Sequence, residues 1–343
     1  MNTNLQELLN TIRDNASAEY QARIPEATQT NILAVQEAML DQNNANCANE
    51  FMNTLINVLI KQELITKLFN NPLKGLKRGT KPVGDTVEEI YNNFLTAEAY
   101  DGTGATLLER KLPDTKTVFH RMNRQDKYKI TVNRMELSKA FSSYGALDSY
   151  VQNIIQTIHN SAENDEYILM KQLIKQALDA NALKVVEIAD PVLGEAEGKA
   201  FIKTVKTVSG LMAFPSTEWN SYLQAQSKDT KPIRTFSRKG EQVLILDTAT
   251  DVSVNVDVLA STFNMSVAEF NDTRKIVIDA FPDASVRGAL LDERFFQIFD
   301  DLMYTSTFMN EEGLYTNYYL HVWQTLAYSI LVNGVIFKVA SGE

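Results

Sequence analysis

The chain has 343 residues, of which 44% are hydrophobic, and its 33 basic and 43 acidic residues give a formal net charge of −10. This length suffices for two domains or one elaborate domain, and the low glycine and proline content excludes a fibrous or low-complexity chain. The acid excess argues against a general nucleic-acid binder, which needs clustered lysine and arginine, but not against a protein that encloses nucleic acid neutralised by counterions.

The amino terminus and the hydropathy pattern predict a protein made in a cytoplasm. The first residues lack the basic start and apolar run of a secretory signal. Every stretch of about 18 residues that is rich in apolar side chains also carries charges, so we expect no membrane span. The single cysteine, Cys47, lies in an asparagine-rich stretch without a nearby activating base, so we interpret it as a structural or incidental thiol.

The first 60 residues predict two helices separated by a polar segment. Apolar residues at helical spacing predict a helix over residues 2–12 and a second one that begins near Phe51. Residues 13–50 are rich in Asn, Gln, Ala and Thr. We therefore expect them to form an arm with some helix and no packed core.

Residues 70–84 contain two prolines and three glycines, which predict a break between elements. The densest basic cluster of the chain lies here and comprises Lys74, Lys77, Arg78 and Lys81. It would suit a contact with DNA or with an acidic partner. A solvated turn is the commoner meaning of such a cluster, because no aromatic residues interleave with the charges.

Residues 85–133 form a long polar excursion, and loops of this size tend to be functional. Tyr128, Ile130 and Val132 alternate with polar residues and predict a strand with one polar face. The segment Thr86 to Leu95 suits a helix as well as a strand. Two glycines make the tip at residues 100–104 flexible.

Residues 148–181 give the strongest helix pattern, with apolar residues from Val151 to Leu178 on one stripe and Asn181 at the left-handed end. The polar middle, Asn160 to Glu166, leaves open whether this is one helix or two.

The remaining pattern mixes short strands and helices, which predicts an α+β or α/β unit over residues 212–312. We expect strands at 184–188, 243–246, 276–278 and 290–291, and helices at 196–211 and 254–263. Near the end, Asn333-Gly334 separates two apolar runs and predicts a β-hairpin.

No constellation of residues in the sequence predicts catalysis. His120, His159 and His321 are far apart and have no zinc-ligand spacing. The segment Asp247 to Ser253 superficially resembles a calcium loop, but Val252 stands where glycine is needed. We therefore expect no catalytic residue, no cofactor and no metal. The sequence instead indicates a protein that functions by contacting other protein subunits.

Five collinear segments resemble the major capsid protein of phi-29-like podoviruses. The first, Asn70 to Asn93, includes Asn-Pro-Leu-Lys-Gly-Leu-Lys-Arg-Gly and Gly-Asp-Thr-Val-Glu-Glu-Ile-Tyr. The others are Leu112 to Gln125, Ile154 to Leu173, Val256 to Met265 and Gly313 to Gln324. Their order and spread make the resemblance specific, although residues 1–50 match poorly.

The resemblance implies an α+β chain with the Hong Kong 97-type capsid fold. Its parts would be an amino-terminal arm (1–81), an extended hairpin called the E-loop (82–135), a peripheral domain (136–211 and 313–343) with a spine helix (148–181), and an axial domain (212–312). The ambiguous segment from Thr86 would then be a strand, and the last hairpin would return to the peripheral-domain sheet. The immunoglobulin-like domain that some members carry is expected to be absent.

The resemblance also implies a function and partners. The chain would assemble with itself, as hexamers and pentamers, into the icosahedral or prolate head of a tailed phage. Scaffolding and portal proteins would be further partners, and the shell would enclose double-stranded DNA without reading its sequence. We expect contacts between subunits at nine residues: Lys74, Lys77, Arg78, Lys81, Ile90, Tyr91, Phe94, Ile130 and Val132.

Two alternatives stay open at this point. An encapsulin-like nanocompartment shell uses the same fold without a virus, and a co-purified cargo enzyme in place of packaged DNA would identify it. A soluble enzyme such as a hydrolase is the alternative from another class, and no motif supports it.

Overall fold

The structure is a computed structural model of the chain. It describes residues 5–28, 30–41, 47–61, 69–100, 102–104, 108–133, 144–225, 231–254, 274–310, 312–313 and 315–340. The chain divides into two compact units. Unit 1 comprises Met1–Asn71, Arg124–Glu166 and Asp300–Trp323, and unit 2 comprises Pro72–Asn123, Tyr167–Phe299 and Gln324–Glu343.

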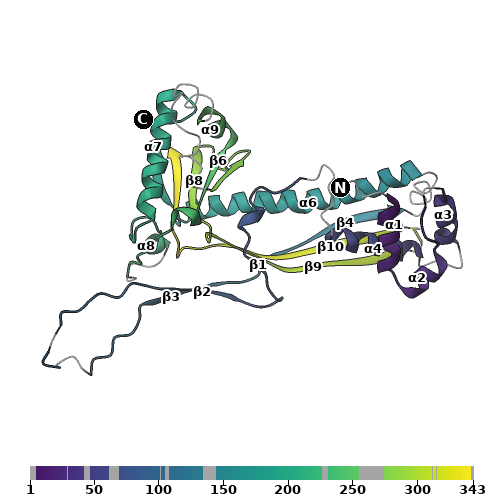
Figure 1. Cartoon of the computed structure of the whole chain (residues 1–343), viewed down its shortest axis with the longest axis horizontal. Coiled ribbons are helices and arrows are strands. Elements are labelled where there is room, and N and C mark those ends of the chain that lie inside the picture. The colour runs from purple at the N-terminus through teal and green to yellow at the C-terminus, as the bar shows by residue number, and fades with distance from the viewer. Residues whose placement is uncertain are drawn as a thin grey trace. The chain divides into compact units, whose positions relative to one another are not determined.

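Helices and strands alternate irregularly along the chain (Figure 1). The described α-helices are α1 (Leu5–Asn15), α2 (Ala18–Arg23), α3 (Ile32–Leu40), α4 (Cys47–Lys61), α6 (Tyr144–Asp179), α7 (Glu195–Met212), α8 (Tyr222–Ala225) and α9 (Thr248–Ser253). The strands are β1 (Gly79–Thr80), β2 (Val87–Asn92), β3 (Thr115–His120), β4 (Arg124–Asn133), β5 (Lys184–Ile188), β6 (Gln242–Asp247), β7 (Arg274–Ile278), β8 (Val286–Asp292), β9 (Phe296–Asn310), β10 (Tyr315–Tyr328) and β11 (Gly334–Val339). Two short 3-10 helices, η2 (Lys74–Leu76) and η3 (Lys239–Glu241), complete the elements. Within the described residues, none of the helices is long and apolar enough to cross a bilayer.

Most of the local predictions are confirmed. Helices α1 and α7 and strands β5, β6, β7 and β8 lie where the periodicity placed them. The ambiguous segment after Thr86 is the strand β2. The helix expected over 254–263 falls largely outside the described residues.

The long helix α6 is continuous, and its polar middle has a structural explanation. The side chain of Asn160 accepts a hydrogen bond from the backbone N–H of Phe69 at 2.9 Å, and Asp165 accepts one from the hydroxyl of Tyr128 at 2.8 Å. These polar side chains therefore join the helix to neighbouring segments of unit 1 and do not interrupt it. Asn181, with a φ of 55°, follows the end of the helix in the left-handed conformation that the sequence predicted.

The expectation that residues 13–50 lack a packed core is wrong. Tyr20, Ile24, Val35 and Met39 are buried in one cluster, which also contains apolar residues of α1, α4, α6, β4 and β10. Short helices are marginal on their own, so this shared core is what stabilises α2 and α3. These apolar residues are spread over α2, its C-cap and α3, so no single stretch of sequence shows their common face.

A five-stranded sheet in the order β5-β11-β8-β6-β7 forms the centre of unit 2. β11 is parallel to β5 and antiparallel to β8, and β6 is antiparallel to β8 and parallel to β7. One apolar cluster contains residues of the sheet and α6, and another contains residues of the sheet and α7. The sheet takes strands from outside 212–312, so that range is not self-contained.

The predicted hairpin at Asn333-Gly334 is wrong. β10 belongs to a four-stranded sheet in the order β1-β9-β10-β4, whereas β11 belongs to the five-stranded sheet. A type I′ turn needs positive φ at both central residues, and neither residue has it. Asn333 is instead fully buried, where its side chain accepts a hydrogen bond from the hydroxyl of Thr235 and donates one to the carbonyl of Met212.

The remaining sheet is the two-stranded ribbon β2–β3, whose strands lie side by side in Figure 1. The ribbon is shorter than the range 82–135 that the resemblance implied, because its paired strands end at His120. The next strand, β4, belongs to the four-stranded sheet.

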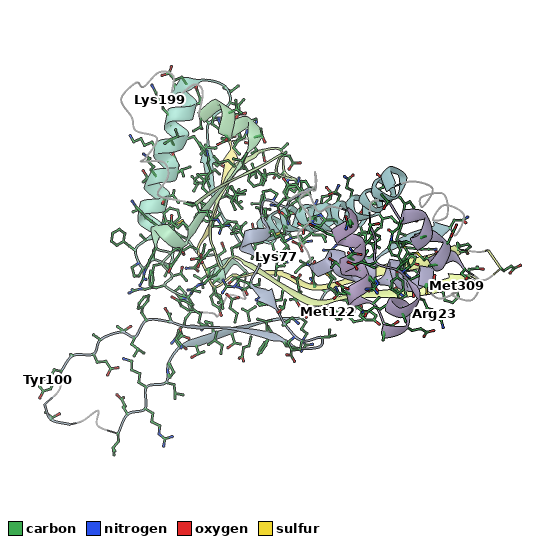
Figure 2. All side chains as sticks on the ribbon, turned by 45° about the vertical axis from the view of Figure 1, so that its right-hand side comes forward. Arg23, Lys77, Tyr100, Met122, Lys199 and Met309 are labelled. Atoms are coloured by element: carbon green, nitrogen blue, oxygen red, sulfur yellow. The ribbon has the colours of Figure 1, made fainter. Side chains whose placement is uncertain are left out.

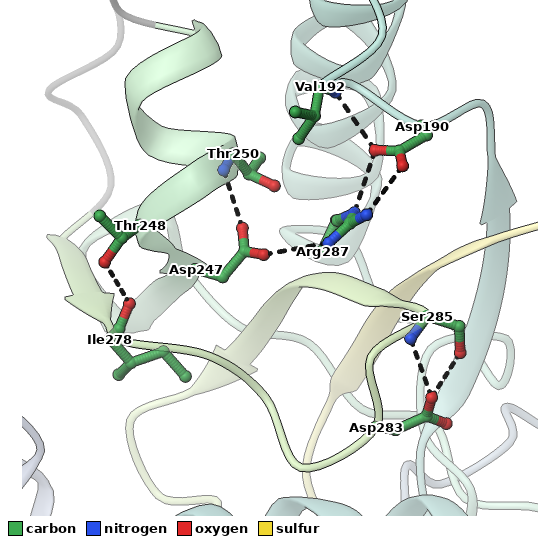
Figure 3. A network of polar contacts seen from close by, with 9 residues as sticks. All are labelled: Asp190, Val192, Asp247, Thr248, Thr250, Ile278, Asp283, Ser285 and Arg287. Atoms are coloured by element: carbon green, nitrogen blue, oxygen red, sulfur yellow. Dashed lines mark hydrogen bonds and ion pairs between the residues drawn. The ribbon is translucent and has the colours of Figure 1, made fainter.

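An ion-pair network in unit 2 joins β8, the loop after β5 and the end of β6 (Figure 3). The guanidinium of Arg287 on β8 lies 2.7 Å from a carboxylate oxygen of Asp190 and 3.4 Å from one of Asp247. Asp247 also caps α9 by accepting a hydrogen bond from the N–H of Thr250 at 2.9 Å. The resemblance to a calcium loop at this point is therefore explained by a helix cap.

Candidate assembly surfaces

The ribbon β2–β3 presents one face to solvent. The strands are antiparallel, with Val87 opposite His120, and successive side chains alternate between the two faces. On the outer face Ile90 is 56% and Phe119 61% exposed. Large apolar side chains on an open face are typical of a surface that another protein covers.

The inner face of the ribbon is held by its own chain. Tyr91 and Val118 pack against a small core formed by Tyr222, Ile233 and Leu331. Tyr91 was expected to contact a neighbouring subunit, and the structure places it half-buried within unit 2. The base of the ribbon is therefore anchored before any partner binds.

A polar cluster strengthens the same anchor. One carboxylate oxygen of Glu89 lies 3.1 Å from Nε2 of His120, and the other accepts a hydrogen bond from the hydroxyl of Ser329. His120 is buried. Its position between strands of its own chain indicates a structural role.

The other two histidines have different surroundings. Nε2 of His321 lies 2.9 Å from the hydroxyl oxygen of Ser306 on the neighbouring strand. Nδ1 of His159 is buried, and no hydrogen-bond partner for it occurs within the described residues. Over the same residues, no three histidines, cysteines or acidic residues are grouped to hold a metal ion.

The segment beyond the paired strands, residues 94–114, is here called the distal loop. Its described part is extended and almost wholly exposed, and the side chain of Tyr100 projects freely in Figure 2. Leu95, Leu108 and Leu112 are 72%, 92% and 83% exposed. Leu108 and Leu112 were missed in the sequence, where they follow no helical or strand period, whereas Leu95 ended the segment that suited a helix as well as a strand. Their signal is the isolation of large apolar residues in a polar segment.

Phe94, a predicted contact residue, lies at the start of the distal loop. Its ring centroid is 6.4 Å from that of Phe236, and both side chains are exposed. The pair forms an apolar surface at the outer end of the ribbon.

The basic segment comprises Lys74, Lys77, Arg78 and Lys81. It is fixed by two buried leucines, Leu73 just before η2 and Leu76 at its end, which insert into the core of unit 2. Lys74 and Arg78 are exposed, whereas Lys77 and Lys81 are half-buried. The segment is therefore an anchored turn on which two of the four basic side chains, Lys74 and Arg78, are exposed.

Ile130 and Val132, the last two predicted contact residues, lie on β4 in unit 1. Val132 is buried, with 5% of its surface exposed, and Ile130 is half-buried against the same core. Both side chains therefore pack in the core of their own unit and do not form an exposed contact surface.

Comparisons with known proteins point to one family. Residues 9–338 match the family described as Phi29-like phage major capsid protein. The major capsid protein of Bacillus phage PZA is 35% identical over 341 residues, which cover 96% of this chain and 72% of that protein. The major capsid protein of Streptococcus phage Cp-1 is 26% identical over 95% of this chain and 92% of its own length.

Solved structures show the same fold at low sequence identity. The capsid structure of Staphylococcus phage Andhra matches with a TM-score of 0.62 at 14% identity, over 82% of this chain and 87% of that chain. A chain from the native bacteriophage P68 head-fibre and inner-core structure gives a TM-score of 0.64, also at 14% identity, over 81% and 87%. With the family match over nearly its whole length, the chain belongs to the phi29-like phage major capsid protein family and has the Hong Kong 97-type fold.

Proposed function

We propose that copies of this major capsid protein join through the distal loop, which lies on a neighbouring copy in the shell. Family membership places the chain in the virion capsid of a tailed phage. The supporting observation is the exposure of Leu95, Leu108 and Leu112, which the described part of their own chain leaves largely uncovered. Burying each leucine in a contact would contribute roughly 1.5–3 kcal/mol, so repeated contacts would add up around a closed shell.

The basic segment supplies a second, polar contact in this proposal. Lys74 and Arg78 are exposed on an anchored turn, and the chain has an excess of acidic residues. They meet acidic residues of a neighbouring copy or of a scaffolding protein rather than DNA. The absence of interleaved aromatic residues in this segment favours that assignment.

The wider assembly follows from the same role. The copies form hexamers and pentamers of an icosahedral or prolate head, with a scaffolding protein and a portal protein as partners. The head encloses double-stranded DNA without reading its sequence, and the chain's net charge of −10 suits enclosure better than tight binding. The chain has a structural and not a catalytic role, consistent with the structural positions of His120 and His321.

The experiment replaces Leu95, Leu108 and Leu112 with serine together. Because all three side chains are exposed, thermal unfolding of the unassembled protein should stay close to that of the wild type. Shell formation in cells that also express a scaffolding protein, measured by sedimentation, should fall at least tenfold.

The matched control is Leu193→Ser, which removes an 80% exposed leucine outside the distal loop. It should assemble like the wild type. Normal shell yield from the triple variant would contradict the role proposed for the distal loop.

A further inference from the structure

A cavity of about 680 Å³ runs along the strand β2. Five successive residues, Val87 to Tyr91, line it, and none of the β3 residues does. Successive side chains point to opposite faces of a strand, so a hollow bordered by all five lies along an edge of β2. The other edge is taken by β3, and the cavity therefore follows the free edge.

The register shows which backbone groups face this cavity. The N–H of Asn93 donates to the carbonyl of Asp114 at 2.9 Å, so this pair is one of the hydrogen-bonded pairs of the antiparallel ribbon. Hydrogen-bonded and non-hydrogen-bonded pairs alternate. The N–H and C=O groups of Glu88 and Ile90 therefore point away from β3.

No strand pairs with that edge among the described residues, because β2 and β3 form a two-stranded sheet. Open edges bind further strands readily, and proteins normally shorten, charge or cover them. An edge beside a preformed cavity is suited to accept an extended segment by β-augmentation. The cavity volume lies in the range of sites that hold a compact ligand, on the order of 300–1,000 Å³.

The rim indicates the chemistry of the segment. Arg78, Arg238 and Arg294 line the cavity and are exposed. Within the described part of the chain, none of the three guanidinium groups has an ion-pair partner within 4.0 Å. Guanidinium groups bind carboxylates with two parallel hydrogen bonds.

The carboxylates of the cavity are largely committed to the chain itself. Glu89 bonds His120 and Ser329, and Glu241 accepts a hydrogen bond from the backbone N–H of Arg238 at 3.1 Å. Asp292 accepts hydrogen bonds from the hydroxyl of Ser237 and the N–H of Arg294. The exposed carboxylate of Glu88 also lines the cavity, and the charge of Arg294 acts on Asp292. Because no ion pair within 4.0 Å engages the three guanidinium groups among the described residues, they can bind carboxylates brought by another molecule.

We propose that an extended segment of a second copy of this chain adds to the free edge of β2 and directs a carboxylate toward these arginines. This inference rests on the proposed shell, in which every subunit meets further copies. Another copy, with its net charge of −10, brings abundant carboxylates. DNA is disfavoured because its backbone has no amide groups to pair with a strand edge.

The test compares two prolines placed on opposite edges of the ribbon. Ile90 lies opposite Thr117 in a non-hydrogen-bonded pair, so proline at either position removes an outward N–H and leaves the β2–β3 hydrogen bonds intact. Ile90→Pro should lower shell yield at least tenfold, whereas Thr117→Pro, on the edge away from the cavity, should assemble like the wild type. Ile90→Ala, which keeps the N–H, should reduce yield far less than Ile90→Pro. Equal yields from the two proline variants would overturn the proposal.

Hydrogen exchange on the wild-type protein gives a measurement that does not depend on how the variants fold. In empty shells stripped of scaffold, the amides of Glu88 and Ile90 should exchange at least tenfold more slowly than in unassembled protein. Shells that form while these amides exchange at the unassembled rate would overturn the inference but not the proposed function. Protection present only while scaffold or DNA is bound would assign the edge to that partner and would also overturn it.

Discussion

Arg287 joins two carboxylates that would otherwise lie partly buried without a counter-charge. Its side chain is 23% exposed, and those of Asp190 and Asp247 are 18% and 7% exposed. The hydrogen bond from Arg287 lowers the pKa of Asp190 below its usual value. The network holds the loop after β5 and the start of α9 against β8.

We predict that Arg287→Met destabilises the unassembled protein by about 1–3 kcal/mol, because it leaves two carboxylates without their partner. Chemical denaturation at pH 7 measures this change in the free energy of unfolding.

The same pair predicts a dependence on pH. The pKa of Asp190 is lower in the folded than in the unfolded chain, so the stability that this carboxylate contributes is fully present above about pH 4 and is lost as the pH falls further. The difference between wild type and variant should therefore shrink below about pH 4, and a difference that stays constant there would contradict the assignment.

Position 334 is occupied by glycine because the five-stranded sheet leaves no room for a side chain there. A Cβ at this position would lie 2.5 Å from a methyl carbon of Leu183 and 3.4 Å from one of Leu291. Both leucines are buried. Close packing, and not turn geometry, explains this glycine.

Replacing Gly334 with alanine should destabilise unit 2 by about 1–3 kcal/mol, the usual cost of overpacking a core. Thermal unfolding measures the effect. Gly240→Ala is the matched control, since an added Cβ there has no neighbour within 4 Å, and it should change stability by less than about 0.5 kcal/mol. An equal effect at the two positions would show that Gly334 is there for another reason.

At the scale of elements, the periodicity of apolar residues predicted the position of helices and strands that short-range interactions determine. The stripe of α6 and the apolar run of β6 each identify an element without reference to the rest of the chain. The partners of a strand are set by distant segments, so the Asn333-Gly334 signal predicted a hairpin where two strands enter different sheets. The core that α2 and α3 share with distant segments was missed for the same reason.

Some of the predicted contact residues are exposed and others are buried in their own unit, for a related reason. The basic segment stands out in composition alone, and the structure presents Lys74 and Arg78 to solvent. Alternation on β4 correctly predicted a strand, but it could not reveal that the apolar face of that strand packs on the core of its own unit. Exposure of the distal-loop leucines depends on the fold and is not encoded in any local period.

The basic segment yields a prediction at the same scale. Lys74→Glu combined with Arg78→Glu should impair assembly, and more strongly at low salt, because exposed charges are screened within about 8 Å at physiological ionic strength. Shell yield as a function of salt concentration measures this. Lys203→Glu with Lys206→Glu, two exposed lysines on α7, makes the same change in net charge and should leave assembly unaltered. Normal assembly with a selective loss of DNA retention would assign the segment to DNA instead.

At the scale of the whole molecule, the exposed apolar residues and the excess of acidic residues are both consistent with a shell subunit. A subunit that repeats one set of contacts around a closed shell needs surfaces that look incomplete in isolation. The ribbon meets this description, because its base is packed on its own chain while its outer face and distal loop are exposed. The base holds the start of the loop on its own chain, and in the proposed shell the loop supplies the contact.

Electron cryo-microscopy of particles from cells that express the chain with a scaffolding protein tests this account most directly. We predict closed shells in which the distal loop of each subunit is ordered and lies on a neighbouring copy, with Leu95, Leu108 and Leu112 buried. Failure to form closed particles, or closed shells in which the distal loop touches no neighbouring copy, would contradict the central claim.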